Sequence, residues 1–264
     1  MNSEYEQIIK QKIELIQRWK GSSAYRQLCL HFQTACDKLI QIGTEFLSQK
    51  DKQDALEKAV IRTIFSSDGG MHRGIYCPSP VYDIIVGNVR RGKRTKQSPA
   101  NSKSYFQYGF DACNQLVWVR QFSGGRPVST EYLLYHENDV YGVTIDNNFR
   151  LQCITEERYI NNILSVYTNA LIAPQNGQYV GIRMHTEQYE FDLDGLKTAT
   201  WYNYSPIMNA LSRKDYHFTC ENGYLIRYSA TERIGEQDYP SKQTAPEYSI
   251  KIKRESFFNP FTST

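Results

Sequence analysis

The sequence lacks any run of about eighteen apolar residues, the length that a helix needs to span a bilayer. Its N-terminal segment is also unlike a signal peptide, because Glu4, Glu6, Lys10 and Lys12 interrupt the apolar residues there. We therefore expect a cytoplasmic protein without a membrane-spanning segment.

Local pairs of metal-ligating residues are missing as well. The chain has no C-x-x-C motif, and its five histidines are far apart in the sequence. His217 and Cys220 are three residues apart in an expected strand, so their side chains would point to opposite faces. The sequence thus predicts no metal and no cofactor. A disulfide framework is equally unexpected, and we predict free thiols at six positions: Cys29, Cys36, Cys77, Cys113, Cys153 and Cys220.

Catalytic motifs are absent too. No G-x-S-x-G sequence surrounds a serine, and no glycine-rich loop is followed by the lysine of a phosphate-binding site. One grouping, His72, Arg73 and Cys77, has the composition of an activated thiol, but a Gly/Pro-rich connector is the favoured interpretation. Two acid pairs, Glu156 with Glu157 and Asp192 with Asp194, show no further sign of acid–base chemistry. Because the sequence contains no catalytic motif, we predict a protein that is not an enzyme.

Neither sign of charge is in large excess, because the chain has 31 basic and 28 acidic residues. A net charge of +3 does not by itself indicate nucleic-acid binding. The densest basic run could bind phosphates or an acidic protein. A solvated loop or an edge strand protected from aggregation is the favoured interpretation of that run, which contains Arg90, Arg91, Lys93, Arg94 and Lys96.

Helical periodicity is present in the first quarter of the chain. Apolar residues at spacings of three and four predict helices over residues 3–20, 24–49 and 54–65. Short turns between them indicate a small helical bundle or hairpin, which we assign to residues 1–66. Residues 67–103 form a connector, with a helix over about 80–91 or a strand from Val81 to Val86 as the alternatives.

Tyrosine is unusually frequent, with 20 residues in 264, and it favours half-buried strands. From residue 104 onward apolar residues alternate, with turn signals every 8–12 residues or so, as in an antiparallel meander. A short helix over 204–214 and a loop over 231–247 interrupt this pattern. We predict one α+β unit, with N-terminal helices followed by a long antiparallel sheet over residues 104–264.

Three stretches share an order in which two alternating aromatic residues precede a turn and a leucine, and we predict that each forms a β-hairpin. They are Tyr108 to Leu116, Tyr189 to Leu196 and Tyr216 to Leu225. The second stretch, Tyr-Glu-Phe-Asp-Leu-Asp-Gly-Leu, resembles the Tyr-Asp unit of Rhs-type repeat proteins. With three irregular copies, the chain resembles bacterial immunity-type proteins of toxin loci more than it resembles a repeat shell.

This resemblance implies a cytoplasmic protein that neutralises a cognate toxin by binding it. We expect its contacts to come from the basic run and from exposed aromatic residues of the sheet. The alternative is an RNA- or DNA-binding module that uses the same basic run and stacks bases on the sheet. The candidate contact residues are Arg90, Arg91, Lys93, Arg94, Lys96, Tyr108, Trp118, Tyr189 and Trp201.

Overall fold

A computed structural model describes residues 3–67, 72–79, 81, 92–99, 103–193, 195–222, 224–238 and 247–253. Three helices come first: α1 (Ser3–Lys20), α2 (Ser23–Ser48) and α3 (Lys50–Ala59). The first two confirm the helices predicted from periodicity, and the Ser22 side chain caps α2 by accepting a hydrogen bond from the Tyr25 N–H. A short 3₁₀ helix, η1 (Gly74–Tyr76), follows later. Of the predicted helix over 80–91 only Val81 lies inside the described residues.

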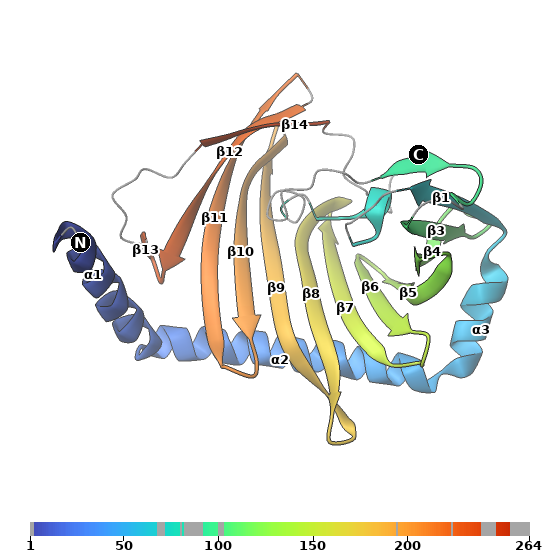
Figure 1. Cartoon of the computed structure of the whole chain (residues 1–264), viewed down its shortest axis with the longest axis horizontal. Coiled ribbons are helices and arrows are strands. Elements are labelled where there is room, and N and C mark those ends of the chain that lie inside the picture. Colours follow the sequence, from blue (N-terminus) through green and yellow to red (C-terminus); the bar gives the residue numbers. More distant parts are fainter. Residues whose placement is uncertain are drawn as a thin grey trace.

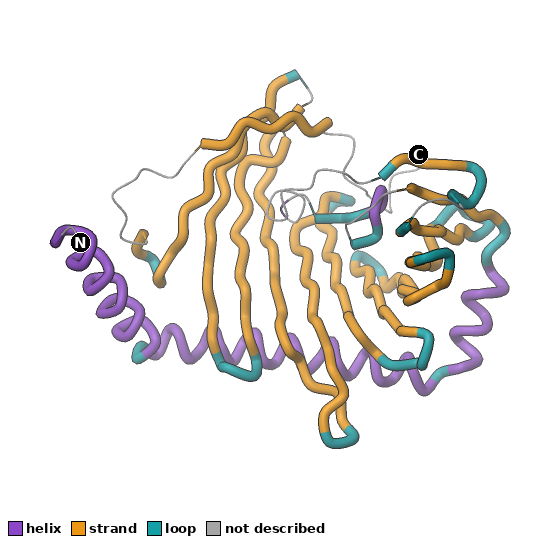
Figure 2. Tube along the Cα trace, viewed as in Figure 1, coloured by secondary structure: helices purple, strands orange, loops and turns teal. Residues whose placement is uncertain are grey.

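One antiparallel sheet contains all fourteen strands of the described residues (Figures 1 and 2). The strands follow one another in chain order from β3 to β13, while β1 lies between β3 and β2, and β14 pairs with β12. The prediction of an α+β protein with N-terminal helices and an antiparallel sheet is therefore confirmed. The strands are β1 (Arg62–Ser67), β2 (Lys93–Thr95), β3 (Ser104–Phe110), β4 (Leu116–Ser123), β5 (Arg126–His136), β6 (Asp139–Asp146), β7 (Leu151–Ile160), β8 (Ile163–Gln175), β9 (Gln178–Asp192), β10 (Gly195–Ser205), β11 (Ala210–Glu221), β12 (Tyr224–Ile234), β13 (Gln237–Asp238) and β14 (Glu247–Lys253).

The three aromatic stretches form the hairpins β3–β4, β9–β10 and β11–β12, as the sequence predicts. The first turn shows why. The Asp111 carboxylate accepts the backbone N–H groups of Cys113 and Gln115 at 3.0 and 2.8 Å, and Asn114 adopts a positive φ of 63°. Asp and Asn favour such turns because their side chains bond to nearby backbone groups.

The prediction of a third helix over 54–65 is wrong at its C-terminal half. Helix α3 ends at Ala59, and Arg62–Ser67 becomes β1, which pairs with β3 on one side and β2 on the other. The run from Val60 to Ile64 is rich in β-branched residues, which fit a pleated surface better than a helix. Sheet pairing adds hydrogen bonds along both edges of this strand.

The expected helical bundle is also wrong, because α2 packs across the sheet and crosses behind the strands in Figure 1. Gly43 shows how closely it approaches: a Cβ at this position would lie 2.8 Å from Leu151 Cδ2 and would overlap Ile154 Cδ1. We call the side of the sheet that contacts α2 the helix face. Its buried residues are Val143, Ile145, Leu151, Ile154, Ala170, Ile172, Met184 and Tyr204.

Two predicted interruptions of the sheet are wrong. The helix expected over 204–214 is the end of β10, a four-residue turn and the start of β11. The Tyr25 hydroxyl accepts the N–H of Leu211 and donates to the carbonyl of Asn209, both at 3.2 Å, so α2 holds this turn. The loop expected over 231–247 is likewise strand as far as Ile234, and Gln237–Asp238 forms β13, whereas residues 239–246 of that loop lie outside the described residues.

All six cysteines are free, as predicted. Cys113 is exposed, whereas the other five are buried or half-buried, and burial raises the pKa of the Cys36 thiol to about 11. Because the thiolate is the reactive form, iodoacetamide at pH 8 should label Cys113 rapidly and the other five thiols slowly. Mass spectrometry of the labelled protein checks this, and Cys113→Ser should lose the fast phase. Fast labelling of a second thiol would contradict the expectation.

No helix among the described residues is both long and apolar enough to cross a lipid bilayer.

Candidate functional site

The face of the sheet opposite α2 carries a cluster of polar residues from three neighbouring strands. Directly opposed residues of an antiparallel pair share a face. Thr155 of β7 lies opposite Asn169 of β8, and Asn169 lies opposite His185 of β9. One step along, Tyr167 lies between Glu157 and Glu187. We call this side of the sheet the network face.

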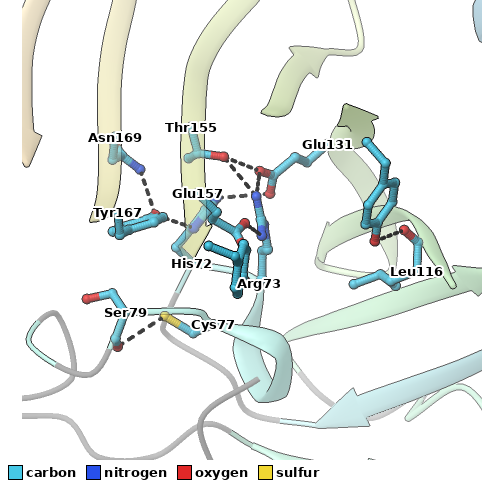
Figure 3. A network of polar contacts seen from close by, with 12 residues as sticks. His72, Arg73, Cys77, Ser79, Leu116, Glu131, Thr155, Glu157, Tyr167 and Asn169 are labelled. Carbon is cyan, nitrogen blue, oxygen red and sulfur yellow. Dashed lines mark hydrogen bonds and ion pairs between the residues drawn. The ribbon is translucent and has the colours of Figure 1, made fainter. Parts of the chain in front are cut away.

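Arg73 enters the network face from the connector between β1 and β2 (Figure 3). Its guanidinium donates from Nη2 to Glu131 Oε1 and to Thr155 Oγ1, both at 2.8 Å, and its Nη1 pairs with Glu157. The residue is 1% exposed. Its backbone has a φ of 56°, a left-handed conformation that a residue other than glycine rarely adopts unless its surroundings hold it there.

Gly142 of β6 provides the space that this ion cluster occupies. A Cβ built on Gly142 would lie 2.5 Å from Arg73 Nη2 and would overlap Glu131 Oε1 and Thr155 Oγ1. Glycine is therefore the residue that lets the guanidinium and the carboxylate meet against the backbone of the sheet.

Charge balance keeps the buried carboxylate of Glu131 ionised. Burial alone would raise the pKa of Glu131, but the nearby charges of Arg73 and His72 outweigh burial and hold this pKa well below its ordinary value. His72 Nε2 lies 2.9 Å from Glu131 Oε2. The Glu131 carboxylate thus contacts the Arg73 guanidinium at one oxygen and the His72 ring at the other.

The other two glutamates of the network face also accept hydrogen bonds from hydroxyl groups. Ser79 donates to both oxygens of Glu187 at 2.8 and 2.6 Å, and the Tyr189 hydroxyl also donates to Glu187. The Tyr159 hydroxyl donates to Glu157 at 2.6 Å. Burial and the Glu187 charge raise the pKa of Tyr189 well above its ordinary value, so its hydroxyl stays protonated.

A chain of polar groups continues from Asn169 to His72. The Asn169 amide donates to the Tyr167 hydroxyl at 3.4 Å, and this hydroxyl lies 3.0 Å from His72 Nδ1. Burial raises the pKa of Tyr167 well above its ordinary value. The Tyr167 proton is therefore retained and can be donated to Nδ1 of a neutral His72.

A cavity of about 730 Å³ opens beside this network. Three buried polar groups of its lining have no hydrogen-bond partner among the described residues: Arg73 Nε, Thr144 Oγ1 and Trp201 Nε1. His185, another lining residue, is neutral at physiological pH, because burial and the charges of Arg183 and His72 lower its pKa to about 3. The described part of the chain holds no cluster of His, Cys, Asp and Glu side chains suited to a metal ion.

The basic run is only partly described. Lys93 and Arg94 belong to the edge strand β2 and are exposed, as is Lys96 just after it. Arg90 and Arg91 lie outside the described residues.

The aromatic residues expected on an exposed surface are buried, which corrects that expectation. Tyr108 is 0% exposed, Trp118 2%, and Tyr189 and Trp201 8% each. The connector that carries η1 packs over this part of the sheet, where the Tyr108 hydroxyl accepts the N–H of Ile75 and donates to the carbonyl of Arg73. These rings form core rather than contact surface.

Part of this site stands out in the sequence as the group His72, Arg73 and Cys77, for which the sequence alone favours a connector. His72 and Arg73 meet Glu131, whereas Cys77 is buried and its thiol lies 3.7 Å from the carbonyl oxygen of Ser79. The pair Glu156 and Glu157 is divided between the faces of β7, and Glu156 instead binds Lys38 of α2 at 3.1 Å. The residues that sequence reasoning missed are Glu131, Gly142, Thr144, Asn169, His185 and Glu187; the available signal was polar residues at alternate positions of otherwise apolar strands.

Comparison with models of known protein families finds no match to this sequence, and comparison with curated proteins finds no significant match either.

Proposed function

We propose that the protein binds a small molecule, rich in hydrogen-bond acceptors, in the cavity on the network face. The observation that carries this proposal is the set of three buried donors, Arg73 Nε, Thr144 Oγ1 and Trp201 Nε1, that line one cavity without partners among the described residues. A volume of about 730 Å³ lies within the range of roughly 300–1,000 Å³ that is usual for small-molecule sites.

Energetics support a ligand that accepts hydrogen bonds. A buried polar group without a partner costs about 1–3 kcal/mol, and a ligand oxygen placed against it would remove that cost. The site is also held rigidly in advance. Glu131 binds Nη2 of Arg73 and Glu157 binds Nη1, so its guanidinium is fixed before a ligand arrives.

The control for this proposal is present in the chain itself. Trp118 Nε1 is also buried without a partner among the described residues, but Trp118 does not line the cavity. Trp201→Phe removes a donor from the cavity, whereas Trp118→Phe removes an equivalent donor elsewhere.

We expect Trp201→Phe to weaken ligand binding about five- to tenfold, since one hydrogen bond contributes about 1 kcal/mol, and Trp118→Phe to leave it unchanged. The measurement is a thermal-shift screen of the purified chain against sugars, nucleosides and hydroxy and keto acids, followed by calorimetric titration of the compounds that bind. The proposal would be contradicted if no compound of the panel stabilised the protein, or if Trp201→Phe and Trp118→Phe lost equal ligand affinity.

A second candidate is the toxin-neutralising role, which the edge strand β2 favours. Lys93 and Arg94 are exposed there, and an edge strand offers free backbone groups to an extended acidic segment of a partner. Co-purification with the product of the adjacent gene tests this role, and Lys93→Gln with Arg94→Gln should weaken the complex. The RNA- or DNA-binding alternative retains only the basic run, because the aromatic rings that would stack on bases are buried.

A further inference from the structure

The cavity has a positively charged outer part, in addition to the network at its inner wall. This inference rests on the proposed function and concerns the same cavity: we infer that its ligand is an amphipathic anion, and that Arg150 and Arg183 bind the anionic group.

Arg150 and Arg183 differ from Arg73 in their surroundings. Arg73 is neutralised by Glu131 and Glu157, whereas neither Arg150 nor Arg183 forms an ion pair with any carboxylate among the described residues. Both line the cavity and both are exposed to solvent. The positive charge of the lining is therefore uncompensated at these two residues.

Local structure holds Arg183 close to the cavity. Its Nε donates to Asn203 Oδ1 at 2.6 Å, which orients the guanidinium while leaving both terminal nitrogens for another acceptor. The Arg183 charge also lies close enough to His185 to contribute to lowering the pKa of that imidazole. A planar guanidinium in this position suits a carboxylate, sulfonate or phosphate group.

Asp146 also lines the cavity, but it forms no ion pair with Arg150 or Arg183 among the described residues. Its carboxylate accepts the backbone N–H groups of Asn148 and Arg150 at 2.8 and 2.9 Å, so it is used in its own turn. The remaining acid of the lining, Glu131, is bound to Arg73 and His72 at the inner wall.

Strands β8 and β9 also contribute apolar side chains to the cavity, in addition to Asn169, Arg183 and His185. Leu171 and Ile182 line the cavity and are 44% and 40% exposed, more than most aliphatic side chains of the sheet. A ligand with an apolar body would cover them and gain about 25 cal/mol for each Å² removed from water. The other apolar lining residues of β8 include Ala173 and Pro174.

Two fluorescent probes that differ in one anionic group test the inference. They are 8-anilinonaphthalene-1-sulfonate and its uncharged parent, N-phenyl-1-naphthylamine. The wild-type chain should bind the sulfonate about tenfold more tightly than the parent in fluorescence titrations, because a charge-assisted contact is strong. The double variant Arg150→Gln, Arg183→Gln should lose this difference and keep its affinity for the parent.

Two control variants complete the experiment. Arg18→Gln changes an exposed arginine of α1 that does not line the cavity and should alter neither affinity. Leu171→Trp fills the cavity and should weaken both probes. If the wild-type chain binds both probes equally well, or if the double arginine variant still prefers the sulfonate, the inference of an anionic ligand is overturned. The proposed function is then still tested by the comparison of Trp201→Phe with Trp118→Phe. If the Leu171→Trp variant binds both probes as tightly as the wild type does, the inference and the proposed function are both overturned.

Discussion

Arg73→Met is expected to lower the free energy of unfolding by about 3–5 kcal/mol at pH 7. The change removes one partner of a buried ion cluster and leaves Glu131 and Glu157 charged in the interior, where they are 4% and 0% exposed. Methionine replaces the arginine side chain as far as the Nε position and keeps that part of the packing, so the loss reports mainly on the missing guanidinium.

The same variant should reverse how stability depends on pH. In the wild type the folded pKa of Glu131 lies below its ordinary value of 4.5, so its contribution is present above about pH 4.5 and is lost as the pH falls. Burial is the largest single influence on this carboxyl, and Arg73 is the largest opposing one. Without Arg73, burial prevails and the folded pKa of Glu131 lies above its unfolded value. The variant should therefore gain stability as the pH falls from 7 to 5.

Urea denaturation at pH 7 and pH 5 measures both effects. Arg120→Met is the matched control, because Arg120 pairs with Glu57 in a geometry where both side chains are about one-third exposed. Such a pair contributes about 1 kcal/mol or less. A loss in Arg73→Met no larger than in Arg120→Met, or the same pH slope as the wild type, would show that the buried cluster does not hold the connector on the sheet.

The parts of the fold that the sequence predicts well are those with local causes. Helix α2 follows from an apolar stripe and a Ser22 cap, and the hairpin β3–β4 follows from alternation around Asp111 and Asn114. In each case the residues that decide the structure are neighbours in the chain. Register then follows, because a shift by one residue would turn an entire buried face to solvent.

The parts that the sequence does not predict depend on distant residues. Strand β1 looks helical in isolation and becomes a strand because β3, some forty residues later, pairs with it. The run at 204–214 resembles a helix start at Pro206, but Tyr25 from α2 bonds to its turn instead. Periodicity contains no information about such partners, and a nearby strand edge outweighs a weak helix propensity.

The candidate site illustrates the same limit more strongly. Arg73 and Glu157 are 84 residues apart, and nothing in either neighbourhood indicates the other. Alternation predicts that Tyr108 and Tyr189 share one side of the sheet with their neighbours, but it does not say that a connector covers that side. An aromatic face expected to hold a partner is for this reason part of the core.

Gly142→Ala is expected to lower the free energy of unfolding by about 2–4 kcal/mol, although it adds a single methyl group. The new Cβ would overlap Glu131 Oε1 and Thr155 Oγ1, so the carboxylate must leave Arg73 or the strands must separate. Gly21→Ala is the control, since the nearest atoms to a Cβ there are backbone oxygens at an ordinary 3.5 Å. Urea denaturation at pH 7 should show a change within about 0.5 kcal/mol for this control.

A double-mutant cycle between Gly142→Ala and Arg73→Met decides whether the cost arises in the ion cluster. Both substitutions separate Glu131 from the guanidinium, so together they should cost clearly less than the sum of their separate effects. If the two losses in the free energy of unfolding add fully, the cost of Gly142→Ala arises from a clash in the strand backbone instead. A shortfall of 1 kcal/mol or more, on the order expected for residues in one network, would show that Gly142 is retained to make room for Arg73, and that the inner wall of the cavity is set by that pairing.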